Sequence, residues 1–249
     1  MSTFSAKGIN IKSYNLGEND KIIVIYTKEH GIIRAVAKGV KKQTSKLAGR
    51  MELLIANQLL IAKGKSLDIV SQAQSIEIFK NLRKDFDKLT YSIYIGEVVL
   101  NFGLEKDPNS SLIYELLFNS LKNVSLATSE NEVLWAINSF LLKFMKIEGY
   151  ALELKNCTKC KEEDNFDNLY ICYDSGGVVC SKCKHTAPQK IQVTKNLLKL
   201  MDDMSKFEFI DENLYTELLS LCFNILKDYV SSKSHKKFKT PLLLDNLCY

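Results

Sequence analysis

Four cysteines constrain this chain more than any other feature. Cys157, Cys160, Cys180 and Cys183 form two C-x-x-C pairs that are separated by 19 residues. This spacing is typical of a zinc site in which two tight turns each supply two thiolates to a tetrahedral shell. Because thiolates fill all four positions, no place is left for water or substrate. We therefore expect one structural Zn²⁺ rather than a catalytic one.

The segment between the two pairs suggests how the site is built. Residues 173–177 (Tyr-Asp-Ser-Gly-Gly) are a turn signal just before the second pair. They predict a zinc ribbon, a short hairpin that carries one cysteine pair at its open end. Cys172 inside this segment and His185 just after it are alternative ligands. Cys222 and Cys248 have apolar neighbours and are predicted to be small core residues.

Two other interpretations of the cysteines compete with a metal site. Core cysteines would lie in an apolar stripe, whereas the neighbours of these pairs include Lys159, Lys161, Glu162 and Lys182. Disulfides would need an oxidising compartment, but the chain has an odd number of cysteines, seven. Its first residues also lack the apolar stretch of a secretory signal. We therefore expect reduced thiols and a cytoplasmic location.

Charge is distributed unevenly along the 249 residues. Residues 1–80 contain 13 Lys and Arg against 6 Asp and Glu, although the net charge of the whole chain is only +5. Such asymmetry favours a basic module that faces a polyanion, joined to a near-neutral scaffold. The longest apolar runs are far too short to span a bilayer, so no membrane partner is expected.

Residues 1–80 have the pattern of a small β-barrel. Segments rich in β-branched and aromatic residues alternate with short turns, and no long helix lies between them. The predicted strands cover residues 4–14, 21–27, 32–38, 51–62 and 67–73. Five strands in so short a segment favour an OB-fold over its rival, an SH3-like barrel.

Beyond residue 80, apolar residues recur at helical spacing instead. They predict helices over residues 82–102, 112–121, 133–147, 194–204 and 212–230. Ser129 and Glu132 resemble a capping box ahead of the third helix. The predicted fold class is therefore α+β and multidomain. It has an OB-fold barrel at 1–80, an α-helical domain at 81–149 and 188–249, and a Cys₄ zinc ribbon inserted at 150–187.

The most basic stretch follows the second strand. It holds six cations and no carboxylate within 17 residues: Arg34, Lys38, Lys41, Lys42, Lys46 and Arg50. Arg34 and Lys38 are four residues apart on a predicted strand, which would place both on one face. The polar residues 39–49 predict a long mobile loop. A barrel face edged by flexible cations suits a phosphate backbone, so the six are candidate nucleic-acid contacts. The alternative is an ordinary solvated lysine loop.

The order of these parts resembles the bacterial RecO family of recombination mediators, over the whole chain. The resemblance rests on Ile22-Ile23-Val24-Ile25-Tyr26-Thr27 followed by Gly31, on Ala37-Lys38-Gly39-Val40-Lys41-Lys42 followed by Ser45, on Glu148-Gly149-Tyr150 ahead of Cys157, and on Gly176-Gly177 ahead of Cys180. Some members of that family lack the zinc cysteines, so the resemblance implies that the ribbon is scaffold rather than mechanism.

The resemblance also implies a function. A protein of this kind binds single- and double-stranded DNA, anneals complementary strands without ATP and takes part in recombinational repair at the nucleoid. Its partners would be RecR and the C-terminal tail of single-stranded DNA-binding protein, and it would help to load RecA. The resemblance identifies no residues of these protein interfaces in this sequence.

The residues themselves favour a binding protein over an enzyme. The sequence has no P-loop, no H-E-x-x-H metal helix and no nucleophile elbow, and its three histidines are scattered. Two other classes stay open: a zinc-ribbon transcription or translation factor that binds RNA, and an enzyme with an unrecognised active site. The first would prefer structured RNA to single-stranded DNA, and the second would need a pocket with converging polar groups.

Overall fold

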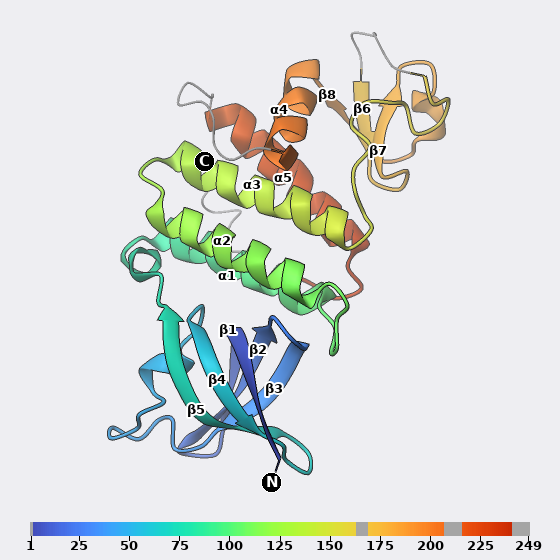
Figure 1. Ribbon diagram of the computed structural model, residues 1–249. Coiled ribbons are helices and arrows are strands. Elements are labelled where there is room, and N and C mark those ends of the chain that lie inside the picture. Colours follow the sequence, from blue (N-terminus) through green and yellow to red (C-terminus); the bar gives the residue numbers. More distant parts are fainter. Residues whose placement is uncertain (1, 163–168, 207–215, 241–249) are drawn as a thin grey trace. The chain divides into compact units, whose positions relative to one another are not determined.

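The computed structural model describes residues 2–162, 169–206 and 216–240 (Figure 1). These residues form two compact units. The first contains residues 2–126 together with 238–240, and the second lies within 127–237. The domain boundaries suggested by the sequence, at residues 80, 149 and 187, stay predictions.

Five strands of the first unit close into a barrel of the OB type. They are β1 (Thr3–Leu16), β2 (Asp20–Thr27), β3 (Gly31–Ala37), β4 (Ala56–Ala62) and β5 (Asp68–Glu77). Their order is β1-β2-β3-β5-β4, and β1 closes the barrel by pairing with both β2 and β4. All neighbours are antiparallel except β3 and β5, which are parallel at Ala35↔Asp68 and Val36↔Ile69. The predicted OB-like barrel is confirmed.

The barrel core follows from the alternation of apolar residues along the strands. Ile23 and Ile25 on β2, and Leu59 and Ile61 on β4, belong to one buried cluster inside the barrel. Side chains two residues apart on a strand point to the same face, so these pairs meet in the interior. Met51, which precedes β4, completes the cluster.

The fourth strand starts later than predicted. Residues 51–55 are apolar enough to continue a strand, but Gly49–Met51 forms a 3₁₀ turn (η1) and Leu54 has a positive φ of 60°. A left-handed residue cannot continue a pleated strand, so β4 begins only at Ala56. The predicted start at Met51 is therefore wrong.

Two helices follow the barrel in the first unit. A 3₁₀ turn, η2 (Lys80–Lys84), leads into α1 (Phe86–Phe102), whose N-cap Asp85 accepts the backbone N–H groups of Asp87 and Lys88. The helix α2 (Ser110–Leu126) begins beside the buried Asp107, which accepts a 3.0 Å hydrogen bond from the Tyr26 hydroxyl on β2. The bond between Tyr26 and Asp107 ties the start of α2 to the barrel within this unit.

Gly31 makes the turn between β2 and β3 possible. Its φ is +65°, and a Cβ at this position would lie 2.3 Å from the backbone oxygen of Leu104. That oxygen accepts a 2.9 Å hydrogen bond from the N–H of Ile32. Glycine is therefore required both by the left-handed backbone and by the close approach of the loop after α1.

Residues 238–240 also belong to the first unit. The backbone N–H groups of Lys239 and Thr240 both donate to the carboxylate of Glu97 on α1, at 2.8 Å each. The ring of Phe238 lies 5.7 Å from that of Tyr94, centroid to centroid. The unit is thus assembled from segments more than 100 residues apart in sequence.

The second unit combines helices with a small sheet. Its helices are α3 (Glu130–Ile147), α4 (Lys195–Lys206) and α5 (Thr216–Lys233). Its sheet has the order β7-β6-β8, all antiparallel, from β6 (Leu169–Cys172), β7 (Gly177–Cys180) and β8 (Lys190–Val193). The buried Asn138 on α3 donates to the Leu219 carbonyl of α5 at 3.0 Å, and Ser139 donates to the Met204 carbonyl of α4 at 2.8 Å.

Two predictions on the helices have different outcomes. The Ser129 hydroxyl accepts the Glu132 N–H at 3.3 Å, as in a capping box, but the Glu132 carboxylate accepts the N–H of Thr128 rather than that of Ser129. Half of the predicted box is therefore formed. The predicted last helix starts at 212, and residues 212–215 lie outside the described residues. None of the helices described is both long and apolar enough to cross a bilayer.

Candidate functional site

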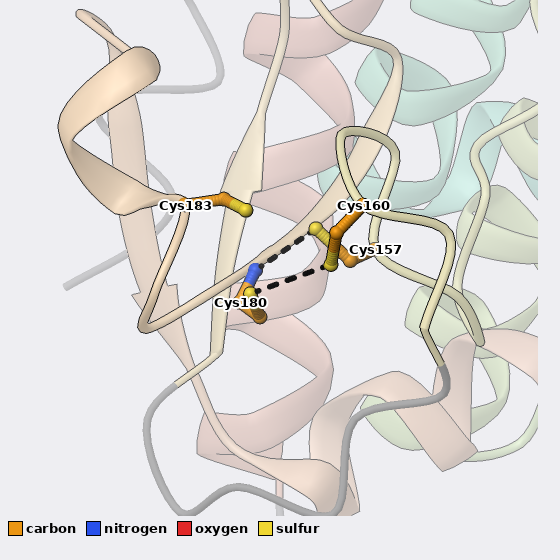
Figure 2. Close-up of side chains that lie close together, drawn as sticks. All are labelled: Cys157, Cys160, Cys180 and Cys183. Carbon is orange, nitrogen blue, oxygen red and sulfur yellow. Dashed lines mark hydrogen bonds between the residues drawn. The ribbon is translucent and has the colours of Figure 1, made fainter.

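The structure brings the four cysteines of the two C-x-x-C pairs together (Figure 2). All four Sγ atoms lie within 4.8 Å of one another, and those of Cys160 and Cys180 are 3.9 Å apart. Tetrahedral coordination with Zn–S bonds of about 2.3 Å places neighbouring sulfurs about 3.8 Å apart. The four thiols can therefore hold a metal ion with little rearrangement.

Two backbone turns position the thiols. In the first, the N–H of Lys161 donates to the Cys157 carbonyl at 2.9 Å, and Lys161 itself is left-handed, with φ +64°. In the second, the N–H of Cys183 donates to the Cys180 carbonyl at 3.1 Å, directly after β7. The N–H of Cys180 also donates to the sulfur of Cys157 at 3.4 Å, which links the two turns.

Gly176 and Gly177 allow the strand that carries the second cysteine pair to pack against the segment that precedes the first pair. Gly176 has φ +69° in the turn between β6 and β7. Gly177 bridges to Glu153, and a Cβ on Gly177 would lie 2.4 Å from the Glu153 carbonyl oxygen. The carboxylate of Glu153 in turn accepts the N–H groups of Lys155 and Asn156 at 2.9 and 3.0 Å, just ahead of the first pair.

The electrostatics of the cluster favour a bound cation. Burial raises the pKa of the Cys157 thiol, but the N–H groups of Cys180, Cys160 and Lys159 outweigh burial and lower that pKa to about 6. The hydrogen bond to Cys180, followed by burial and the hydrogen bond to Cys160, raises the pKa of Cys183 to about 12, and the charges of Cys157 and Cys160 add to this rise less strongly. Neighbouring thiolates therefore oppose each other's ionisation, and a metal cation removes that opposition.

The other candidate ligands do not join this cluster. Cys172 is buried in the small core beside the four cysteines, and His185 is exposed in the 3₁₀ turn η3 (Lys184–Thr186). Within the described ranges, the four cysteines are the one group of three or more such side chains placed to hold a metal. Cys222 is fully buried on α5, and burial raises its pKa, as suits a core thiol. Cys248 lies outside the described residues.

The six predicted DNA contacts are all exposed. Arg34 points out from β3 and pairs with Glu105 at 2.7 Å, where it lines a cavity of about 730 Å³ together with Phe4 and His30. Lys38 lies in the turn just after β3 rather than on the strand. The predicted third strand therefore extends one residue too far, and a shared face for Arg34 and Lys38 stays a prediction.

The segment after β3 is a loop, as predicted, but it is anchored along its length. Val40 and Met51 are buried in the barrel core, and Leu47 packs against the same cluster. The N–H of Lys41 donates to the Asn19 carbonyl at 3.0 Å. Because apolar residues at intervals hold the segment to the barrel, its lysines project from a defined backbone. A freely moving loop is not what the structure shows.

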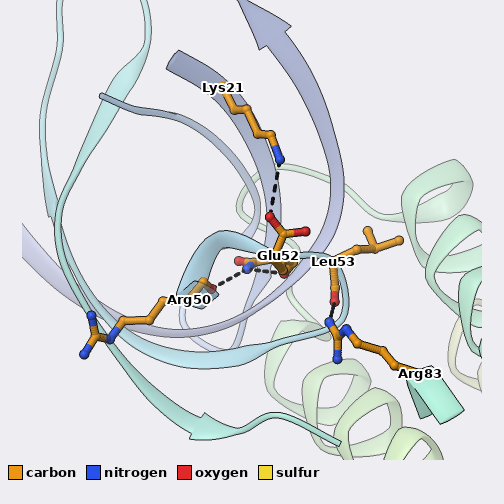
Figure 3. A network of polar contacts seen from close by, with 6 residues as sticks. Lys21, Arg50, Glu52, Leu53 and Arg83 are labelled. Atoms are coloured by element: carbon orange, nitrogen blue, oxygen red, sulfur yellow. Dashed lines mark hydrogen bonds and ion pairs between the residues drawn. The ribbon is translucent and has the colours of Figure 1, made fainter. Parts of the chain in front are cut away.

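Two buried asparagines fix the end of this segment. The side-chain N–H groups of Asn10 donate to the carbonyls of Arg50 and Glu52, at 2.9 and 2.8 Å. Asn57 donates to the same Arg50 carbonyl at 2.8 Å. Figure 3 shows this region, with Lys21 directed at the carboxylate of Glu52 at 3.4 Å.

Sequence reasoning missed three cations near the end of this segment. Lys46 and Arg50 line a groove of about 750 Å³, and Lys80, Arg83 and Lys84 of η2 line it too. We name these five residues the basic groove. The signal in the sequence was the density of charge at 80–84, three cations in five residues directly after β5.

Comparisons with known proteins agree with this architecture. The family model described as "Recombination protein O N terminal" matches residues 1–79, and the one described as "Recombination protein O C terminal" matches residues 83–241. The chain belongs to the RecO family. The resemblance stated from the sequence motifs is thereby confirmed.

Relatives from several bacteria that are named "DNA repair protein RecO" match this chain. The relative from Nostoc sp. is 48% identical over 186 residues, which are 72% of this chain and 62% of that protein. The one from Gloeothece citriformis is 37% identical over 183 residues, 71% of this chain and 64% of that RecO. The one from Desulforamulus reducens is 27% identical over 254 residues, 99% of this chain and 96% of its own length. The first two matches thus span under two thirds of those RecO proteins.

Proposed function

We propose that this chain is a DNA-binding recombination mediator that anneals complementary strands without ATP. It binds single- and double-stranded DNA in the cytoplasm, at the nucleoid, and acts by binding rather than by catalysis. The observation that carries the proposal is the set of exposed cations on β3 and the segment after it, on an OB-like barrel in a chain of the RecO family. OB barrels recur as nucleic-acid binding modules.

The mechanism follows from electrostatics. Lysines that neutralise phosphates release condensed counterions, and this release drives sequence-independent binding. Two complementary strands repel each other through their phosphates, so cations that bind both strands lower the barrier to pairing. Lys38, Lys41 and Lys42 are exposed on a backbone that Val40 and the Lys41 N–H hold to the barrel. They can therefore contact DNA without ordering a free loop first.

The experiment that tests DNA binding uses the triple variant Lys38→Ala/Lys41→Ala/Lys42→Ala. Six phosphate contacts to a single strand predict a log–log salt slope of about −4, and removing three makes it shallower by about 2. The matched control changes Lys122, Lys146 and Lys199 to Ala, which are exposed on α2, α3 and α4. A triple variant that binds and anneals like the parent, with an unchanged slope, would refute this assignment.

The same assay separates the alternative function. Competition between single-stranded DNA and structured RNA, at equal salt, distinguishes a recombination mediator from a zinc-ribbon factor of transcription or translation. A mediator prefers single-stranded DNA, and its annealing activity persists without ATP. Preference for structured RNA would favour the alternative.

We further propose that Cys157, Cys160, Cys180 and Cys183 hold one structural Zn²⁺. Four thiolates with no open position suit a scaffold role, and the sulfur geometry supports this donor set. Protein purified without chelator should contain one zinc per chain, and Cys160→Ser should lose the metal while leaving the barrel folded. Elemental analysis that finds no metal in the parent would overturn the assignment.

The partners are proposed on the family alone. They are RecR, the C-terminal tail of single-stranded DNA-binding protein and, indirectly, RecA. Residues 233–239 are a candidate rim for the acidic tail, but the Lys233 ammonium donates to the Tyr173 carbonyl at 2.7 Å, so Lys233 is the least available of these cations. Fluorescence anisotropy with a labelled tail peptide tests this binding, and no binding at low salt would count against it.

A further inference from the structure

We infer that the basic groove is a second contact for the phosphate backbone of single-stranded DNA, centred on η2 rather than on the loop after β3. The inference rests on the proposed function, because it takes DNA as the ligand. It adds three residues, Lys80, Arg83 and Lys84, and places their contact in one groove with Lys46 and Arg50.

The charge of the groove favours an anionic ligand. Five cations line it against one carboxylate, that of Glu52. The ammonium of Lys21 lies 3.4 Å from this carboxylate and already offsets its charge (Figure 3). In the described part of the chain, the side chains of Lys46, Lys80 and Lys84 have no ion-pair partner. Each is exposed, so the cost of gathering like charges falls when an anion arrives.

The arginine in η2 is oriented in advance. Arg83 donates from Nη2 to the Leu53 carbonyl at 2.6 Å and from Nη1 to the Ile78 carbonyl at 3.1 Å. Figure 3 shows its guanidinium reaching Leu53. A guanidinium has five N–H donors, so three remain for a ligand after these two bonds. Arginine held in this way loses little freedom when it binds a phosphate oxygen.

A phosphodiester chain suits the groove better than an acidic peptide does. The groove is continuous in sequence with the proposed DNA contacts, because Lys46 and Arg50 end the same segment as Lys38, Lys41 and Lys42. One strand can therefore pass from the loop into the groove.

The test uses the full-length protein with Lys80→Gln/Lys84→Gln, which keeps much of each side-chain stem and leaves Arg83 in place. At about 0.7 per contact, the log–log salt slope for an oligothymidylate of about 20 nucleotides should become shallower by about 1.4. Affinity should fall about 25-fold at 0.1 M salt and stay nearly equal to that of the parent at 1 M. The matched control, Lys122→Gln/Lys199→Gln, removes the same charge from α2 and α4.

Each outcome decides the inference. A slope equal to that of the parent, or an equal effect in the control, overturns it. If the Lys38/Lys41/Lys42 variant still loses affinity in that case, the proposed function stands without the groove.

Lysine acetylation of the parent, read by mass spectrometry, gives a second measurement that does not depend on folding of a variant. Lys80 and Lys84 should be protected by the oligonucleotide, and Lys122 should not. Protection by an acidic peptide but not by DNA would overturn the inference in favour of a peptide site.

Discussion

Asn10 should control the stability of the segment that carries the cations. It is 1% exposed on β1, and its amide donates to the carbonyls of Arg50 and Glu52 at 2.9 and 2.8 Å. Asn10→Leu keeps a similar size but removes both donors. The Arg50 carbonyl keeps its 2.8 Å bond from Asn57, so only the Glu52 carbonyl loses its partner in this pair.

The magnitude follows from these contacts. Each hydrogen bond contributes about 1 kcal/mol net, so the variant should lose about 2 kcal/mol of unfolding free energy in the barrel. DNA affinity should fall by up to about 5-fold at 0.1 M salt, the effect of losing one phosphate contact, because the Arg50 carbonyl keeps only the Asn57 bond of the two that hold it.

Hydrogen exchange is the suitable assay. The single tryptophan, Trp135, lies in the second unit, so its fluorescence does not report on the barrel. In peptides from β2 and β4, a loss of about 2 kcal/mol should speed exchange about 30-fold. Peptides from α3 serve as an internal reference, and Asn15→Leu, at an exposed position of the same strand, is the control. An acceleration below about 3-fold, or an equal one in the control, would refute the assigned role of Asn10.

Two further predictions concern the ribbon and the helices of the first unit. Gly177→Ala places a Cβ 2.4 Å from the Glu153 carbonyl oxygen and should displace the second cysteine pair. We therefore expect the variant to release zinc faster than the parent in a colorimetric chelator assay. Release at the parental rate would contradict the packing argument. Burial, aided by the charges of Glu115 and Glu29, raises the pKa of Tyr114 to about 12. Its contribution to stability is therefore complete below the unfolded value near 10 and is lost as the pH rises through 12. Between pH 9 and 11 the melting temperature followed by circular dichroism should fall less for Tyr114→Phe than for the parent; an equal fall would exclude this residue as the cause.

The parts of the fold that depend on local sequence could be predicted. The x-x spacing of each cysteine pair fixes a turn, so the four thiols were found without any tertiary information. The alternation of apolar residues at Ile23 and Ile25 likewise predicted the bounds of β2 to within one residue. The start of β4 could not be predicted, because residues 51–55 satisfy the apolar pattern while Leu54 takes a left-handed conformation imposed by its surroundings.

The basic groove depends on distant parts of the chain. Lys46 and Lys80 are 34 residues apart in sequence and line one groove only because β4 and β5 return the chain to the same end of the barrel. No periodicity in the sequence encodes that return. The roles of the buried asparagines Asn10 and Asn57 could not be predicted for the same reason. A polar residue within a strand pattern gives no indication of the distant carbonyl groups to which it donates.

The position of residues 238–240 has a consequence for biosynthesis. These residues donate to Glu97 and place Phe238 against Tyr94, so the first unit contains a piece that the ribosome makes only after residues 127–237. At about 5–20 residues per second, the 111 residues of 127–237 delay this piece by about 6–22 s after α2 is complete. During that interval α1 presents the Tyr94 side chain and an unoccupied Glu97 carboxylate. The first unit therefore stays incomplete on the ribosome until the whole second unit has been synthesised.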